Sequence, residues 1–188
     1  MTPVLAFMLF AAPDSAAAPQ AQAATQKYRL GPRAGKMQFQ AFSRLTDPLG
    51  SFQTWRGSVT VPEGDLTRAI VEVHVEVGTI DTANKKRDAH LQNADFFNAP
   101  KWPLATFRSK GLKPLGKGRY TVAGTLKMMG VSKAISFPAQ VAVVGGKLVV
   151  KADFKMDRTQ WGMGGYLSSF SVNPIKKSVR VFFDLKSN

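Results

Sequence analysis

Apolar and polar residues alternate one by one through much of this chain, and this period of two most restricts the folds open to it. In residues 70–77 every second position from Val71 to Val77 is valine, and the residues between them are Glu72, His74 and Glu76. Neighbouring side chains of a strand point to opposite faces of a sheet. The segment is therefore expected to be a strand with one dry face and one solvated face.

The same alternation predicts further strands, separated by Gly, Pro, Asp and Asn. The expected strands span residues 37–42, 52–61, 70–77, 120–128, 132–144, 148–156 and 178–185. Gly145-Gly146 suits the turn of a hairpin. Residues 79–98 interrupt the pattern: Asp81-Thr82 offers a helix cap, and residues 85–93 have spacing compatible with a short helix.

Seven or eight half-buried strands leave exposed edges unless the sheet closes on itself. The expected fold is therefore all-β, a single antiparallel β-barrel of about eight strands with one short helical insertion. No internal repeat or linker divides residues 25–188, so one domain is expected to cover them.

Residues 1–24 have the features of an export signal. An apolar run at residues 4–12 is too short to span a bilayer, and Ala21-Gln22-Ala23 fits a signal-peptidase cleavage pattern. No Lys or Arg precedes the run, so either the signal is atypical or the true start lies upstream. A disordered leader rich in Ala and Pro is the alternative. The signal-peptide interpretation places the mature protein in the bacterial periplasm or outside the cell.

The chain is strongly basic, with 26 Lys and Arg against 12 Asp and Glu and a formal net charge of +14. Such a charge attracts anionic surfaces, either membrane headgroups or nucleic acid. The dense runs are Lys85-Lys86-Arg87 and Lys176-Lys177, and neither has the interleaved aromatic residues of a nucleic-acid platform. We therefore expect no nucleic-acid partner, and transient contact of residues 85–87 with an anionic membrane.

Few residues could carry catalysis or hold a metal. The chain has no cysteine, two histidines and no G-x-S-x-G motif, so thiolate sites, a complete zinc site and this type of hydrolytic triad are not expected. Asp88 and His90 are expected to bond to each other and to nearby backbone, which ties the helix across one barrel end. The alternative is a lipid-acting enzyme with His90 as the base and Asp88 orienting it.

Several motifs follow one another in an order found in one known family. They are Gly50-Ser51-Phe52, Trp55-Arg56-Gly57, residues 79–84 (TIDTAN), residues 87–91 (RDAHL), residues 95–98 (DFFN), Trp102-Pro103, residues 120–126 (YTVAGTL), residues 130–133 (GVSK) and residues 157–162 (DRTQWG). By these motifs the chain resembles the YceI-like family over roughly residues 28–185. The resemblance implies an extended lipocalin-like barrel, usually periplasmic, that encloses a polyisoprenoid, quinone-like or fatty-chain ligand.

The expected function is that of an exported, non-enzymatic carrier with a long apolar ligand inside the barrel and no other cofactor. Each buried methylene contributes about 0.8 kcal/mol, so a long chain can offset the cost of its immobilisation. Strand parity and the family pattern select the lining residues Phe39, Phe52, Trp55, Val73, Val75, Phe97, Leu126, Met128, Phe154 and Phe183. Arg87, Asp88 and His90 complete the set, either as headgroup contacts or as structural residues. The oligomeric state, monomer or dimer, stays open.

Overall fold

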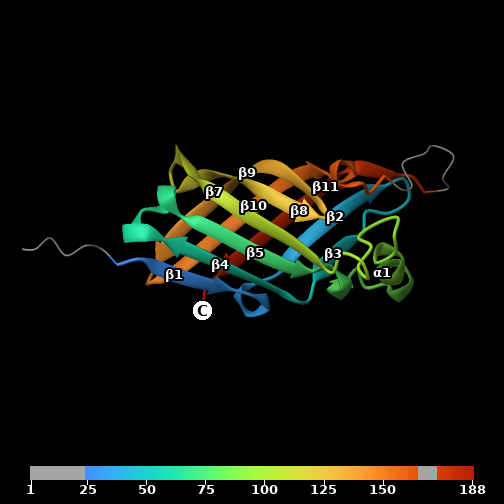
Figure 1. Ribbon diagram of the computed structural model, residues 1–188, viewed down its shortest axis with the longest axis horizontal. Helices are drawn as coiled ribbons and strands as arrows, with labels where there is room; N and C mark the ends of the chain where they lie inside the picture. The colour runs from blue at the N-terminus through green and yellow to red at the C-terminus, as the bar shows by residue number, and fades with distance from the viewer. Residues whose placement is uncertain (1–23, 165–172) are drawn as a thin grey trace, which may run out of the picture.

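The computed structural model describes residues 24–164 and 173–188, which form one curled antiparallel sheet with a short helix at one end (Figure 1). The first strands are β1 (Gln26–Leu30), β2 (Met37–Ser43), β3 (Leu49–Phe52), β4 (Trp55–Val61), β5 (Ile70–Glu76) and β6 (Ile80–Asp81). After helix α1 (Lys85–Leu91) come β7 (Leu104–Gly116), β8 (Arg119–Met128), β9 (Val131–Val144), β10 (Lys147–Asp157) and β11 (Ile175–Lys186). Short 3-10 helices are η1 (Pro32–Ala34), η2 (Pro62–Gly64), η3 (Leu66–Arg68), η4 (Val77–Thr79) and η5 (Arg158–Trp161).

The spatial order of the strands is β1-β4-β5-β7-β8-β9-β10-β11-β2-β3-β6. Only two residues separate β3 from β4 in the chain. β4 pairs with β5, and β3 pairs with β6 in the same way. Likewise β1 and β2 flank η1, and β5 and β6 flank η4, so each of these pairs is one interrupted strand. In the described chain the eleven segments therefore amount to eight long strands, and the expected antiparallel all-β fold of about eight strands is confirmed.

The sheet closes on itself along only part of its length. β2 pairs with β11 on one side and with β3 on the other. Within the described residues β1 pairs with β4 and not with β11, so the shell is a half-barrel along this seam. Gly35 lies between η1 and β2, next to β11. Its φ is 143°, and a Cβ there would lie 2.3 Å from the Asp184 carbonyl oxygen of β11. Only glycine lets the chain approach β11 so closely.

All seven expected strands are present, with one of them divided. Residues 52–61 are broken at Gln53 and Thr54, between β3 and β4. β1, β6 and β7 were not predicted. The sheet thus extends to Gln26, whereas the expected leader lies almost wholly outside the described residues and stays a prediction.

Helix α1 starts where the sequence indicated but not with the expected cap. The Asn84 side chain accepts the Arg87 backbone N–H at 3.0 Å, so Asn84 is the N-cap. The expected cap at Asp81-Thr82 was wrong, because Asp81 accepts the N–H of Ala83 in the preceding turn and Thr82 bonds to Asp88. No helix among the described residues is long and apolar enough to cross a membrane.

Candidate functional site

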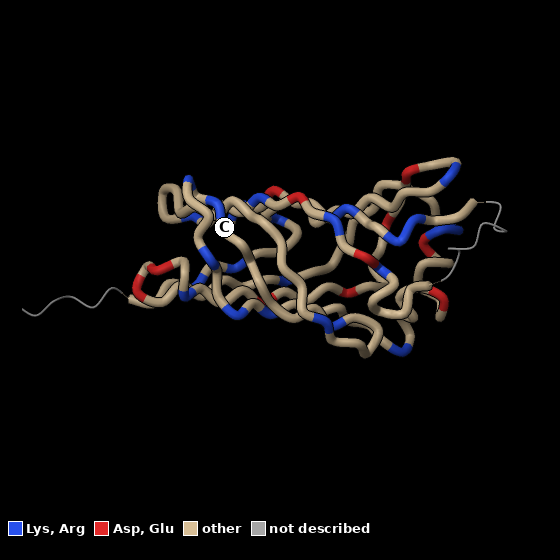
Figure 2. The backbone as a smooth tube through the Cα atoms, turned by 90° about the horizontal axis from the view of Figure 1, so that it is seen from above, with Lys and Arg blue, Asp and Glu red and all other residues tan. Residues whose placement is uncertain are grey.

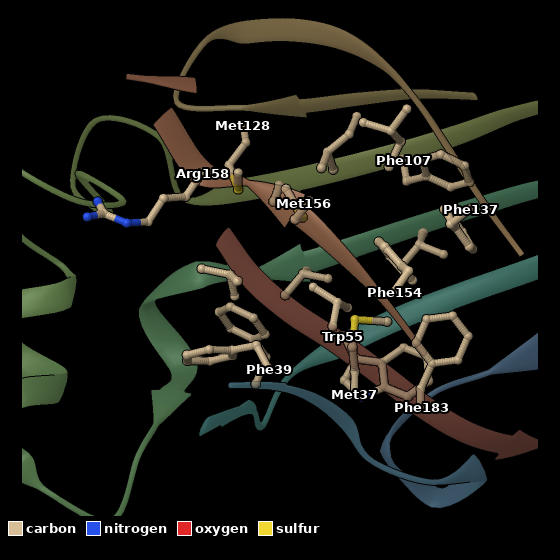
Figure 3. Close-up of a pocket in the computed structure, with 18 of the residues that line it drawn as sticks. Met37, Phe39, Trp55, Phe107, Met128, Phe137, Phe154, Met156, Arg158 and Phe183 are labelled. Carbon is tan, nitrogen blue, oxygen red and sulfur yellow. The ribbon is translucent and has the colours of Figure 1, made fainter. Parts of the chain in front are cut away.

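A cavity of ≈ 780 Å³ lies inside the curled sheet. Its wall consists mainly of Phe, Met, Leu, Ile, Val and Ala side chains that the alternating strands direct inward. Figure 3 shows Met37, Phe154 and Phe183 among the side chains that face this space. The interior is therefore a hollow apolar chamber and is not filled by its own side chains.

Aromatic rings from β7, β9 and β10 form one part of the wall. The rings of Phe137 on β9 and Phe154 on β10 are stacked, with centroids 4.2 Å apart and planes 9° from parallel. Phe107 on β7 contacts Phe137 at 5.8 Å. Gly124 on β8 makes room for this ring, since a Cβ there would lie 2.6 Å from the tip of Phe107. These contacts fix the shape of the wall.

A second aromatic group lies toward the α1 end of the barrel. Phe52 contacts Phe39 at 5.6 Å and Phe97 at 5.7 Å, the latter edge to face. Phe39 lies across Gly50, where a Cβ would come within 2.3 Å of its ring. Gly50 thus allows Phe39 to reach across the hairpin of β2 and β3 and join the wall.

Thr82 organises the start of α1 beside the cavity. Its hydroxyl accepts a hydrogen bond from Arg87 Nε at 2.8 Å, and its carbonyl accepts one from Arg87 Nη2 at 2.7 Å. The Thr82 N–H donates to Asp88 Oδ1 at 2.9 Å, and the Thr82 hydroxyl donates to the same oxygen. Arg87 and Asp88 are therefore both fixed to one buried threonine.

His90 and Arg158 meet on a shared aromatic ring. His90 packs edge to face on Phe96, with centroids 5.2 Å apart, and the Arg158 guanidinium lies 5.8 Å from the Phe96 centroid. His90 belongs to α1 and Arg158 begins η5, so Phe96 joins two segments that are far apart in sequence. In Figure 3 the Arg158 side chain points away from the Phe and Met residues of the interior.

Arg158 is the most buried charged residue on the cavity wall, with 5% exposure. Its guanidinium donates to the carbonyl oxygens of Ile175 and Lys176, each at 3.2 Å, and to that of Met163. Burial lowers the pKa of Arg158, and the neighbouring Asp157 counteracts part of this effect. Arginine stays protonated in proteins, so the cavity end carries a fixed positive charge.

The structure brings together nearly all the predicted site residues. Those on the cavity wall are Phe39, Phe52, Trp55, Val73, Val75, Arg87, His90, Phe97, Leu126, Met128, Phe154 and Phe183. Asp88 is not on the wall, because its carboxylate turns to Thr82. The expected Asp88–His90 bond is also wrong: Asp88 bonds to nearby backbone as expected, but His90 packs on Phe96. Whether the wall residues contact a ligand stays a prediction.

Sequence reasoning missed several wall residues. Phe107 lies on the unpredicted β7, and Phe137 lies on a predicted strand whose inward face had not been assigned. Arg158 belongs to the motif at residues 157–162, but the motif gave no position for its side chain relative to the barrel. In the described part of the chain, no group of three or more His, Asp or Glu residues could hold a metal ion.

Comparison with known proteins identifies the family. The family profile of the YceI-like domain matches residues 28–187, which is most of the chain. The chain belongs to the YceI-like family. Among curated relatives, a UPF0312 protein of Azotobacter vinelandii is 32% identical over 91 residues, covering 48% of this chain and 47% of the relative. A UPF0312 protein of Yersinia enterocolitica is 32% identical over 124 residues, covering 66% of this chain and 57% of the relative. The chain therefore spans about half the length of the curated relatives it matches.

Solved structures of YceI-like proteins share the fold. BcnA of Burkholderia cenocepacia superposes with a TM-score of 0.74 at 21% identity, covering 82% of this chain and 96% of BcnA. A polyisoprenoid binding domain from Saccharophagus degradans gives 0.67 at 15% identity, covering 87% of this chain and 99% of that domain. At these identities the likeness concerns the fold alone.

Proposed function

We propose that this YceI-like protein is a carrier that holds one long apolar chain inside the barrel. The ligand classes are a polyisoprenoid, an isoprenoid quinone or a fatty-chain amphiphile. The observation that carries the proposal is the apolar cavity of ≈ 780 Å³, which lies within the range of about 300–1,000 Å³ typical of ligand pockets. The likeness in fold to a polyisoprenoid binding domain from Saccharophagus degradans supports the ligand class.

The wall chemistry suits binding better than catalysis. Transfer of a chain from water to this wall gains about 0.8 kcal/mol per methylene. In the enzymatic alternative Asp88 would orient His90, but the two residues have different partners. Asp88 bonds to Thr82, and His90 packs on Phe96. An acid–base pair needs the base held by its orienting group, and the Asp88–Thr82 bonds do not supply this.

Export is part of the proposal. It rests on the apolar run and the Ala21-Gln22-Ala23 pattern of residues 1–24, and it places the carrier in the periplasm or outside the cell. In that location a shielded chamber would let a lipid cross an aqueous space without exposing its chain to water.

The decisive experiment identifies what the protein carries. Native mass spectrometry of protein purified from cells should show an added mass, and organic extraction should release a long-chain molecule. The variant Ala139→Phe places a ring at a buried position of the cavity wall and should reduce the bound fraction. The matched control Ala142→Phe lies on the same strand but is exposed, so it should leave binding unchanged. If the native protein takes up no lipid or quinone, the carrier proposal is wrong.

A further inference from the structure

The charged residues of the cavity wall all have the same sign. Among the described residues that line the cavity, Lys86, Arg87 and Arg158 are charged, and none is Asp or Glu. All three lie at the α1 end, where β3, β6 and η5 also lie, and the rest of the wall is apolar apart from Thr82, His90 and Asn173. The chamber is therefore apolar along its length and cationic at one end.

Two of these cations are held in place by the protein itself. Arg87 is fixed by the hydroxyl and carbonyl oxygens of Thr82, at 2.8 and 2.7 Å. Arg158 is buried and donates to the main-chain carbonyls of Ile175 and Lys176. These acceptors are uncharged and orient the guanidinium groups. Two carboxylates outside the cavity wall offset part of the positive charge: Asp88 shares the Thr82 hydroxyl with Arg87, and Asp157 adjoins Arg158.

The cationic end is also compact. Phe96 contacts His90 at 5.2 Å and the Arg158 guanidinium at 5.8 Å, and His90 shares helix α1 with Lys86 and Arg87. One side of α1 and the start of η5 thus meet around one ring. An anionic group placed here would lie partly out of water, where charge-assisted hydrogen bonds to guanidinium are stronger than at an exposed surface.

We infer that the cavity selects chains with an anionic head, a carboxylate or a phosphate, which Arg87, Arg158 and Lys86 bind while the apolar tail fills the chamber. This inference rests on the proposed carrier function and narrows it. Fatty acids and polyprenyl phosphates are favoured over a quinone or an alcohol of the same chain length, because only an anionic head forms ion pairs with these cations.

The test compares ligands that share a tail and differ in their head. Delipidated full-length protein is titrated with oleate, oleyl phosphate and oleyl alcohol at neutral pH, with displacement of a neutral fluorescent chain as the readout. Oleate and oleyl phosphate should bind about tenfold more tightly than oleyl alcohol, a difference of ~1.4 kcal/mol. Inorganic phosphate alone should not displace the probe; if it does so as well as oleyl phosphate, the site takes a free ion and the inference is wrong.

Variants on α1 supply the matched comparison. The double variant Lys86→Gln, Arg87→Gln should bring the affinity for oleate close to that for oleyl alcohol and leave the alcohol affinity within about twofold. Lys85→Gln removes one positive charge from an exposed neighbour that is not on the wall, and it should change neither affinity. Retained binding of oleyl alcohol shows that the double variant is folded.

The outcomes separate the two proposals. Equal affinities of the parent for oleate, oleyl phosphate and oleyl alcohol would refute the selection of an anionic head and leave the carrier function standing. Failure of all three chains to bind would refute the carrier function. If the double variant loses alcohol binding as well, the single variant Lys86→Gln decides, because Lys86 is exposed: an unchanged preference for oleate would overturn the inference.

Discussion

Thr82 shows how one side chain can position several residues at the edge of the cavity. It accepts two hydrogen bonds from Arg87 through its hydroxyl and carbonyl oxygens, and it donates to Asp88. Thr82 is 5% exposed, so water cannot readily replace these partners. The side chains of Arg87 and Asp88 at the start of α1 are therefore both positioned by Thr82, through its hydroxyl and its backbone groups.

We predict that Thr82→Val lowers the free energy of unfolding by about 1–3 kcal/mol, because the valine keeps the shape of threonine and removes the hydroxyl. Urea denaturation measures this loss. Thr82→Ser retains the hydroxyl and should lose less stability than Thr82→Val. Equal losses in both variants would show that packing of the methyl group, and not the hydrogen bonds, is what Thr82 contributes.

His90→Ala tests the enzymatic alternative at the residue that would act as base. Loss of the edge-to-face contact with Phe96 should cost about 0.5–1.5 kcal/mol in addition to the lost packing area. We expect no esterase or isomerase activity in the native protein for this variant to remove. An activity that disappeared in His90→Ala while the melting temperature stayed constant would contradict the carrier proposal.

Asp157 makes stability dependent on acid. The Thr159 hydroxyl and then the Thr159 backbone N–H donate to Asp157 Oδ1, at 2.6 and 2.9 Å, and lower the pKa of this carboxyl. A depressed folded-state pKa contributes stability above the unfolded value of about 3.9, and this contribution is lost as the pH falls through the folded-state value. The urea midpoint should therefore decline below about pH 4, and it should decline less in Asp157→Asn. An identical decline in both proteins would show that other carboxylates determine the acid limit.

At the scale of the elements, β7 shows where sequence periodicity fails. Ala105, Phe107 and Ser109 follow one parity, but the register shifts between Ser109 and Leu112, and Leu112 is the next buried residue. A β-bulge changes which parity faces inward, so residues 104–116 did not read as one alternating strand. The uninterrupted parts of β5, β8, β10 and β11 were predictable because their parity holds.

The residues of the candidate site were predictable on the regular strands and not on the segments between them. Parity placed Val73, Leu126 and Phe154 on the cavity wall, as the structure shows. Arg158 lies on a 3-10 helix, where a period of two gives no direction for the side chain. The partners of Asp88 and His90 depend on the tertiary positions of Thr82 and Phe96, which local sequence does not determine.

The packing of β7 on β8 can be tested through Gly124. A Cβ at this position would lie 2.4 Å from the Arg108 carbonyl oxygen and 2.6 Å from the Phe107 ring. We predict that Gly124→Ala lowers the free energy of unfolding by about 1–3 kcal/mol, because β7 or the Phe107 ring must shift. The control Ala123→Gly changes the exposed neighbour, and any loss there reflects strand propensity alone. Wild-type stability of Gly124→Ala would mean that Phe107 moves without cost.

For the whole molecule, the distribution of charge matters more than its sum. Figure 2 shows Lys and Arg along the length of the barrel, with no single cationic face in that view. Lys85 and Lys86 are exposed at the α1 end, whereas Arg87 is held by Thr82 and is less available to an outside partner. The expected membrane contact of residues 85–87 therefore depends on the two lysines.

We predict that the double variant Lys85→Gln, Lys86→Gln binds anionic vesicles less than the parent, at a cost of about 1 kcal/mol per lysine. Liposome co-sedimentation measures this, and the difference should shrink with added salt as the Debye length falls to about 8 Å at physiological ionic strength. The control Lys117→Gln, Lys147→Gln alters the turns at the opposite barrel end. Equal effects of both double variants would indicate attraction by net charge without a docking end.

The hollow interior also makes the volume of the protein a measurable property. Water occupies an apolar chamber poorly, and unfolding then admits water into space that the native state left partly empty. Hydrostatic pressure favours the state of smaller volume, and the volume change of unfolding grows with the internal void. A barrel emptied of its chain should accordingly unfold at lower pressure than a loaded one, with buried Trp55 and Trp161 reporting the transition by fluorescence. The pressure at which the protein unfolds would thus report whether the chamber is occupied.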